Sequence, residues 1–204
     1  MEYFNSSDEF WESVICGDES RICLFGSDGR LRRWIKIEEK DSDKRIQETV
    51  KYGGGGVMVW GCMSGKGVGN LAFIDGNLNT AGYIDLLSMH LPESIKNMNL
   101  KSLIFQQENA PCHVSSTAKL FFEVKKIKCM DWPAQSPDLN PIENIWAYIK
   151  YKLCRAKMTS LEMLKEEIHR IWNNLPSRFF TNMAKSMNKR CRQVIEKKGG
   201  WIKH

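Results

Sequence analysis

Long apolar runs are missing from this 204-residue chain. None approaches the roughly 20 residues that a helix needs to cross a bilayer, so we expect no membrane-spanning segment. The first 13 residues are polar and acidic, which is not the composition of a secretory signal. The seven cysteines include no C-x-x-C pair, which argues against a zinc ribbon, and their odd number argues against a disulfide framework. We therefore expect a reducing compartment and mostly structural thiols.

Two patterns that would indicate other chemistry are incomplete. Gly61 and Gly65 enclose three residues where a phosphate-binding loop has four, and Gly67 follows Lys66 where that loop has Ser or Thr. His113 has no second histidine at the spacing of a metal site, so it is expected to order a loop or cap a helix. The sequence thus indicates no small-molecule cofactor.

Basic charge is what the second half of the chain has in excess. Residues 1–100 carry 15 acidic and 11 basic side chains, whereas residues 101–204 carry 9 and 19, which together give the net charge of +6. This asymmetry indicates a polyanionic partner for the second half, and a solvated basic face is the alternative. Residues 178–204 alone contain eight Lys and Arg against the single acid Glu196.

The composition, 42% hydrophobic and 26% charged, is that of a globular protein long enough to bury a core. Short apolar runs predict strands in residues 13–37, where three form a β-meander, and at 57–63, 70–76, 103–105 and 127–130. Helical spacing of apolar residues predicts helices after Asn79, at 114–126, after Asn140, from Thr159 to Pro176, and at 180–194. This order predicts a mixed sheet flanked by helices.

Three acidic residues occupy positions that such a sheet would bring together. Asp18 follows the first strand-like run, Glu108 follows the buried run at 103–105, and Glu143 lies in the first turn of the helix after it. Because α/β proteins place their sites at strand ends, we expect the three carboxylates to converge. Carboxylate oxygens are the ligands that hard divalent cations prefer, so these residues predict a metal site.

Two of these positions have competing interpretations. Glu143 would complete a capping box with Asn140 and would suit the positive end of its helix, which is a purely structural role. Glu19 directly follows Asp18 and is its nearest rival as the first acid.

Four segments carry a resemblance to a known family. They read VICGDESRICLFGSDGRLRRW, GGGGVMVWGCMSGKG, FQQENAPCH and DWPAQSPDLNPIENIW, in that order. They resemble consecutive motifs of the Tc/mariner transposases, in the Tc-type branch, and SPDLNPIENIW is a highly specific signature. The likeness extends from Trp11 to the closing KKGGWIKH, and it favours Asp18 over Glu19 as the first acid.

The resemblance implies an RNase H-like α/β fold, with a mixed β-sheet flanked by α-helices and a helical C-terminal extension. We expect a lead-in segment at residues 1–12 and a DDE catalytic domain at residues 13–157. Basic helices at 158–204 would pack on the same domain.

The resemblance also implies a catalytic and metal-binding triad. The family has two Asp and one Glu, with 34 residues between the second and the third acid, and 34 residues separate Glu108 from Glu143 here. Asp18 would bridge two Mg²⁺ or Mn²⁺ ions, while Glu108 and Glu143 would each hold one. The second position departs from the family, which has Asp where this chain has Glu108.

The implied activity is strand cleavage at transposon ends and strand transfer into target DNA, hence DNA integration, in the nucleus. The expected partners are double-stranded DNA, contacted by Lys189, Arg190 and Arg192, and a second copy of the chain as a homodimer. The family has two N-terminal helix-turn-helix modules, for which this chain has no room, so sequence-specific recognition is expected to be weak. The alternative is a catalytically inactive relic that only binds DNA or a transposase subunit, and Glu108 favours it.

Overall fold

The computed structural model describes residues 3–24, 55–101, 103–134, 136–156 and 158–202. Its centre is one mixed sheet of five strands: β1 (Val14–Cys23), β2 (Gly56–Ser64), β3 (Gly67–Ile74), β4 (Ile104–Gln106) and β5 (Lys128–Cys129). Their order across the sheet is β3-β2-β1-β4-β5, antiparallel from β1 to β3 and parallel from β1 to β5.

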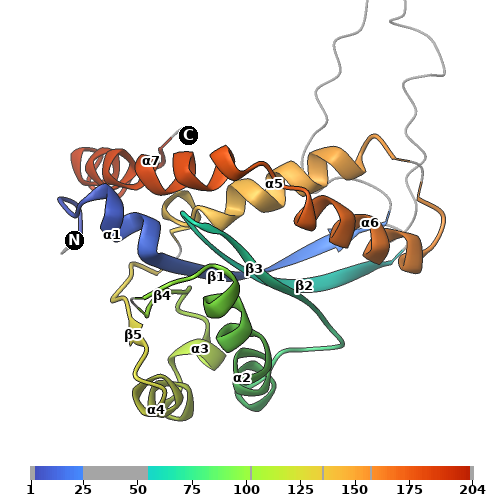
Figure 1. The fold of residues 1–204 in the computed structure, drawn as a ribbon, viewed down its shortest axis with the longest axis horizontal. Helices are drawn as coiled ribbons and strands as arrows, with labels where there is room; N and C mark the ends of the chain where they lie inside the picture. The colour runs from blue at the N-terminus through green and yellow to red at the C-terminus, as the bar shows by residue number, and fades with distance from the viewer. Residues whose placement is uncertain (1–2, 25–54, 102, 135, 157, 203–204) are drawn as a thin grey trace, which may run out of the picture.

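Helices cover both faces of this sheet (Figure 1). One face carries α1 (Asp8–Ser13), α5 (Ile142–Leu153), α6 (Leu161–Asn173) and α7 (Ser177–Glu196), and the other carries α2 (Thr80–Asn97), α3 (Pro111–Val114) and α4 (Ser116–Val124). The expected mixed sheet between helices is therefore confirmed. No helix in these described ranges is long and apolar enough to span a membrane.

Side chains of β1 alternate between the two faces, as in any strand. Val14 and Cys16 belong to the core beneath α5–α7, whereas Ile15 belongs to the core beneath α2 and α4. Asp18 continues the first series, and Glu19 continues the second. Two adjacent acids therefore point to opposite sides of the sheet.

The first strand differs from the prediction. We expected separate strands on either side of residues 17–20, but β1 runs unbroken through them because β2 pairs with it along its length, from Cys16 opposite Met63 to Cys23 opposite Gly56. Asp18 therefore lies inside a strand. Pairing with β4 ends at Cys16, however, so Asp18 still stands where one neighbouring strand has stopped. The rest of the predicted meander, to residue 37, lies outside the described residues.

The predicted hairpin at residues 57–76 is confirmed as β2 and β3. Its outer strand is irregular, because the register shifts between Gly61 and Met63. At that point the main-chain N–H of Asn70 donates to Ser94 Oγ of α2 at 2.8 Å, and the indole of Trp172 in α6 donates to the main-chain oxygen of Gly69 at 2.9 Å. Both helix layers therefore bind the same short stretch of β3.

The start of α5 also differs from the prediction. Asn140 was expected to cap this helix, but the helix begins at Ile142 after Pro141, without a side-chain cap. Asn140 instead ends a 3₁₀ turn at Pro137–Leu139, where its main-chain N–H bonds to Pro137. The capping-box interpretation of Glu143 fails, because the Asn140 side chain is 1% exposed and has no hydrogen-bond partner among the described residues.

Candidate active site

Asp18 is a buried carboxylic acid on the sheet face beneath α5. The residue is only 5% exposed, and its Oδ2 accepts a hydrogen bond from the indole Nε1 of Trp146 at 3.1 Å. Burial raises the pKa of Asp18 to about 8, and the negative charges of Glu143, Glu19 and Glu108 act in the same direction. The main-chain hydrogen bond of Glu19 opposes them. The main charges acting on Asp18 are thus acidic.

Glu143 lies in the first turn of α5 and is partly buried. Burial raises its pKa, the charge of Glu108 raises it further, and Lys150 opposes both. Trp146, which donates to Asp18, follows Glu143 by three residues in the same helix, and residues three apart lie on one helix face. One helix therefore supplies an acid and the hydrogen-bond partner of another acid.

Glu108 stands on the loop between β4 and α3. Its main-chain oxygen lies 3.0 Å from Nδ1 of His113, and the next residue, Asn109, donates to the main-chain oxygen of Trp132 at 2.8 Å. The charge of Glu108 raises the pKa of both Asp18 and Glu143. The three predicted acids therefore lie near enough, where β4 ends beside β1, for the charge of Glu108 to act on the other two.

A polar network on the opposite face positions the Glu108 loop. Glu19 Oε1 lies 3.3 Å from His113 Nε2, and the ring of Tyr83 packs on His113 with centroids 4.1 Å apart. The Tyr83 hydroxyl donates to Gln107 Oε1 at 2.5 Å, and Gln107 Nε2 donates to the main-chain oxygen of His113 at 3.2 Å. Glu19 is therefore engaged away from Asp18, and His113 orders the loop as its isolated position in the sequence indicated.

The titration of His113 follows from this network. Burial lowers the pKa of His113, but its contacts with Glu19 and the main-chain oxygen of Glu108 outweigh burial, and the pKa is raised. A protonated His113 would partly balance the carboxylate of Glu19 on that face. On the other face, the main charges that act on Asp18 are negative, and Lys150 opposes the raised pKa of Glu143.

The donor set suits a pair of hard divalent cations. A cation would stabilise the charged forms of Asp18 and Glu143, whose pKa values burial and neighbouring acids raise, and oxygen donors are what Mg²⁺ and Mn²⁺ bind. In the described part of the chain, no three His, Cys, Asp or Glu side chains are arranged to ligate a single ion. The expected division, with Asp18 shared and Glu108 and Glu143 assigned to different ions, requires only two of these acids per ion.

Arg190 was predicted to contact DNA, and the structure corrects this prediction. The residue is 3% exposed, and its guanidinium donates to the main-chain oxygen of Asp138 at 3.1 Å, to Asn144 Oδ1 at 2.8 Å and to Ser186 Oγ at 2.9 Å. Asp138 and Asn144 flank the turn that leads into Glu143. From its position in α7, Arg190 therefore holds the segment that carries Glu143.

The sequence contained a signal for this role. Arg190 follows Met187 by three residues and precedes Cys191, and both belong to the buried face of α7. Lys189 and Arg192, the other two predicted DNA contacts, are exposed on the same helix.

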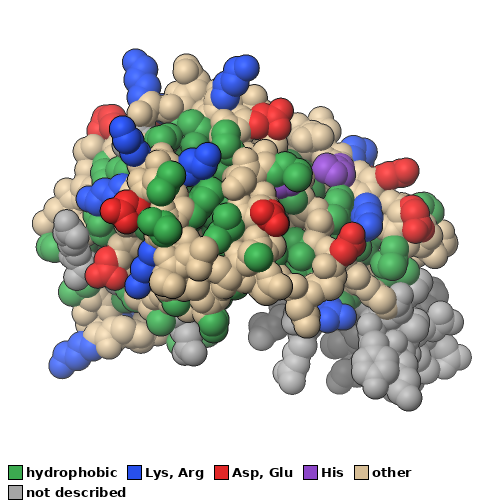
Figure 2. Space-filling model, turned by 90° about the horizontal axis from the view of Figure 1, so that it is seen from below, with side chains coloured by type: hydrophobic (Ala, Val, Ile, Leu, Met, Phe, Trp, Pro, Cys, Tyr) green, Lys and Arg blue, Asp and Glu red, His purple; other side chains and the backbone are tan. Residues whose placement is uncertain are grey.

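Charges on the face formed by α2–α4 are mixed rather than segregated. Figure 2 shows acidic and basic side chains scattered among apolar ones on that side of the molecule. A polyanion has less to bind there than along α7. The exposed charges of that helix are basic at Arg178, Lys185, Lys189 and Arg192, and acidic only at its last residue, Glu196.

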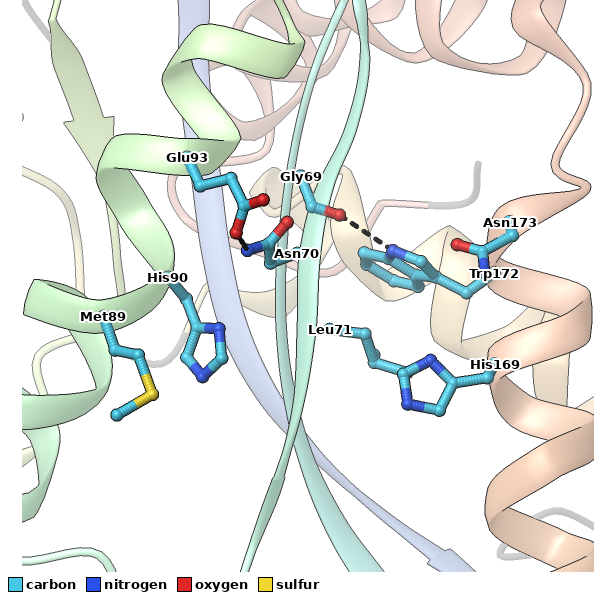
Figure 3. Close-up of a pocket in the computed structure, with 9 residues that line it drawn as sticks. All are labelled: Gly69, Asn70, Leu71, Met89, His90, Glu93, His169, Trp172 and Asn173. Atoms are coloured by element: carbon cyan, nitrogen blue, oxygen red, sulfur yellow. Dashed lines mark hydrogen bonds between the residues drawn. The ribbon is translucent and has the colours of Figure 1, made fainter.

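A separate hollow of about 360 Å³ lies beside β3, between α2 and α6 (Figure 3). His90 and His169 line it from the two helices, and burial lowers the pKa of His90. Glu93 also lines the hollow, and its carboxylate accepts a hydrogen bond from the side-chain amide of Asn70 at 2.7 Å. None of the three acids lines this hollow, so the candidate site is the acidic edge rather than the hollow.

Comparisons with known proteins show the family of the chain. The model of a family described as DDE superfamily endonuclease matches residues 13–165. The chain is 34% identical over 192 residues to the Tcb2 transposase of Caenorhabditis briggsae, covering 93% of this chain and 69% of that protein. It is 32% identical over 196 residues to the Tc3 transposase of Caenorhabditis elegans, covering 95% and 59%.

Solved structures share the fold. The catalytic domain of Mos1 mariner transposase superimposes with a TM-score of 0.75 at 18% identity, covering 99% of this chain and 89% of that one. The Mos1 paired end complex with Mn gives a TM-score of 0.84 at 18% identity, covering 99% and 60%. These likenesses confirm the expected fold class.

Proposed function

This chain belongs to the DDE superfamily endonucleases, as a catalytic domain of the Tc/mariner transposases, and we propose that Asp18, Glu108 and Glu143 are its catalytic, metal-binding acids. The observation that carries the proposal is that acids from a strand, a loop and a helix meet at one sheet edge, where the charges of Glu143 and Glu108 raise the pKa of the buried Asp18 and the charge of Glu108 raises that of Glu143. Structures of the Mos1 catalytic domain with Mn and with Mg support a divalent cofactor.

Two bound Mg²⁺ or Mn²⁺ ions would activate the attacking oxygen and stabilise the leaving oxygen of a phosphodiester. The residues of this chain supply the cradle. Asp18 presents a carboxylate that is buried and oriented by Trp146, Glu143 approaches from the first turn of α5, and Glu108 approaches from its loop. Asp18 would be shared between the ions, and the two glutamates would each hold one.

The substrate is double-stranded DNA, as transposon ends and target. Paired-end and strand transfer complexes of Mos1 support this assignment, and they support action as a homodimer. Lys189 and Arg192, exposed on α7, would contact the phosphate backbone. Because the substrate is chromosomal DNA, the protein would act in the nucleus. We also propose that residues 1–12 are a lead-in segment, that residues 13–157 form the catalytic domain, and that the basic helices of residues 158–204 pack on it.

Glu108 favours a second candidate function, that of a relic without chemistry. Replacing Asp by Glu adds one methylene and displaces the carboxylate by about 1.5 Å. The charge and the oxygen donors are kept, so such a protein would still bind metal and DNA.

A nicking assay separates the two functions. Purified protein is incubated with supercoiled plasmid and Mn²⁺, and nicked circles are counted, with Asp18→Ala and Glu143→Ala as blanks. The transposase function predicts nicking that requires Mn²⁺ and both acids. Nicking that survives Asp18→Ala would overturn the assignment of the acids, and nicking by Glu108→Asp but not by wild type would favour the relic.

A further inference from the structure

We infer that Trp146 is a positioning residue for Asp18, whose carboxylate it orients through the indole N–H. This inference rests on the proposed function, because orientation matters only if Asp18 is a metal ligand. Trp146 is 1% exposed and its Nε1 lies 3.1 Å from Asp18 Oδ2. If the carboxylate turned away, the buried indole would lose the acceptor that the structure provides.

The position of Trp146 is itself fixed by a second tryptophan. The rings of Trp146 and Trp172 stack with centroids 5.3 Å apart and an interplanar angle of 23°. Trp172 is in turn anchored by its hydrogen bond to the main-chain oxygen of Gly69, drawn as a dashed line in Figure 3. Trp172 therefore holds Trp146 through the face of its ring, which a Phe would keep, while its own N–H is directed to β3.

A glycine in the sheet makes room for both rings. Gly61 pairs directly with Asp18 between β2 and β1. A Cβ on Gly61 would lie 2.5 Å from the ring of Trp172 and 3.0 Å from the ring of Trp146. The two indoles therefore lie against the backbone immediately beside Asp18, where a larger residue than glycine would push them away.

The chemistry of the donor suits a metal ligand. An indole N–H donates one hydrogen bond and carries no charge. It can hold the orientation of a carboxylate without neutralising it, whereas Lys or Arg would compete with a cation for the same charge. Hydrogen bonds that orient metal ligands typically change metal affinity by about 10- to 100-fold when they are removed.

Matched substitutions within the stack test this role. Trp146→Phe keeps an aromatic ring beside Trp172 and removes the N–H to Asp18. Trp172→Phe is the control, because it makes the same change in the same stack but removes the N–H to Gly69. The affinity of each full-length variant for Mn²⁺ is measured by titration calorimetry, with Asp18→Ala as the blank. We expect Trp146→Phe to weaken binding about tenfold and Trp172→Phe to change it by less than about threefold.

Equal losses in the two variants, or wild-type affinity in Trp146→Phe, would overturn the inference. A second measurement needs no tryptophan variant: the indole N–H resonance of Trp146, assigned in the wild-type chain by nitrogen-15 NMR. It should shift in Asp18→Ala and on titration with Mg²⁺, and no shift in either experiment would contradict the contact.

The two proposals fail in distinguishable ways. If Mn²⁺ affinity depends on Asp18 but not on Trp146, the positioning role is wrong and the proposed function stands. If the Trp146 resonance responds to Asp18→Ala while Mn²⁺ affinity does not, the contact is real but Asp18 is not a ligand, which overturns both the proposed metal site and the positioning role.

Discussion

Asp18 and Glu143 are held in a different way from Glu108. Helix α5 links the first two, because it carries Glu143 in its first turn and places Trp146 against Asp18 in β1, and we refer to these two acids with α5 as the rigid unit. Glu108 stands on a loop, and the contact that fixes it is made by its main-chain oxygen to His113. The rigid unit therefore fixes the side chain of Asp18, whereas the loop contact of Glu108 fixes the backbone from which this side chain extends.

Of the acids compared, Glu108, the residue that departs from the family, is the one at which a longer side chain disturbs the packing least. An extra methylene at position 18 would have to fit into a site that is 5% exposed, in an interior that is close-packed. The Glu108 side chain is partly exposed and has more room. A longer acid is thus tolerated by the fold at Glu108, although the reaction still requires its carboxylate to be placed accurately.

The largest effect should come from the ionisation of Asp18 in the rigid unit. The pKa of this acid is raised from 3.8 to about 8 in the folded chain, so between these values the folded state keeps a proton that the unfolded chain has released. Stability of the metal-free protein therefore falls as pH rises through this interval, by at most about 1.4 kcal/mol per pH unit. Urea unfolding at pH 5 and pH 8 measures the loss, and Asp18→Asn should abolish this contribution.

Saturating Mg²⁺ should reverse the loss in wild type at pH 8, because a cation stabilises the ionised carboxylate. The variant Asp18→Asn should gain less from the ion. Equal pH dependence in wild type and Asp18→Asn would mean that burial does not affect this acid.

The next effect concerns the clamp on Glu143. Arg190→Gln removes the guanidinium, which donates to Ser186, Asp138 and Asn144, and leaves Asn144 and the main-chain oxygen of Asp138 without their buried donor. We expect the free energy of unfolding to fall by about 3 kcal/mol. Arg192→Gln is the control, since it removes the same charge from an exposed position of the same helix and should change stability by less than about 0.5 kcal/mol. Equal effects would show that Arg190 does not brace this region.

A smaller effect is expected at the loop acid. Glu108→Asp should raise the rate of plasmid nicking at least about tenfold, which corresponds to about 1.4 kcal/mol of activation barrier. The reason is that a catalytic group misplaced by about 1 Å can lower the rate on the order of 100-fold. The assay uses equal protein and Mn²⁺, with Asp18→Ala as the blank. Glu143→Asp makes the same shortening on the rigid unit and should lower the rate. If wild type already cleaves as fast as Glu108→Asp, Glu108 is a competent ligand.

The smallest effect lies outside both regions. Replacing Lys189 and Arg192 by Gln should weaken binding to duplex DNA and reduce the slope of log affinity against log salt by about 0.9 for each phosphate that the protein no longer neutralises. Lys119→Gln and Lys125→Gln, exposed at α4 on the face of mixed charge, are the controls. Fluorescence anisotropy at several salt concentrations measures both. A slope unchanged by the α7 pair would place the DNA elsewhere.

The sequence predicted the layered fold because its signals are local. Alternating glycines and apolar runs marked the β2–β3 hairpin, and helical spacing marked α5–α7. The interruption expected at residues 17–20 was wrong, because pairing with β2 overrides the weak strand preference of GDES. The exact residue at which a helix begins, as near Asn140, depends on how the preceding turn packs rather than on which residue could cap the helix.

The site was predictable in its acids but not in what surrounds them. Motif and spacing predicted Asp18, Glu108 and Glu143 as the acids of the proposed site. The hydrogen bond from Trp146 joins residues 128 positions apart, and the guanidinium of Arg190 reaches residues 46 and 52 positions away. Such contacts exist only after the sheet and the helices have assembled, so no local pattern indicates them. A count of basic residues likewise cannot separate the buried Arg190 from the exposed Lys189.

The attachment of β3 to both helix layers has a consequence for how the sheet assembles. Slippage of an outer strand by one residue would exchange its buried and exposed side chains, and nothing beyond an edge strand opposes such slippage. Here Ser94 and Trp172 bind adjacent residues of β3 from opposite faces, and Gly69 allows the approach because a Cβ there would lie 2.5 Å from Ser94 and from Cys62. The outermost strand can therefore adopt only one alignment that satisfies both helices, and its edge is less available to recruit a strand from another molecule.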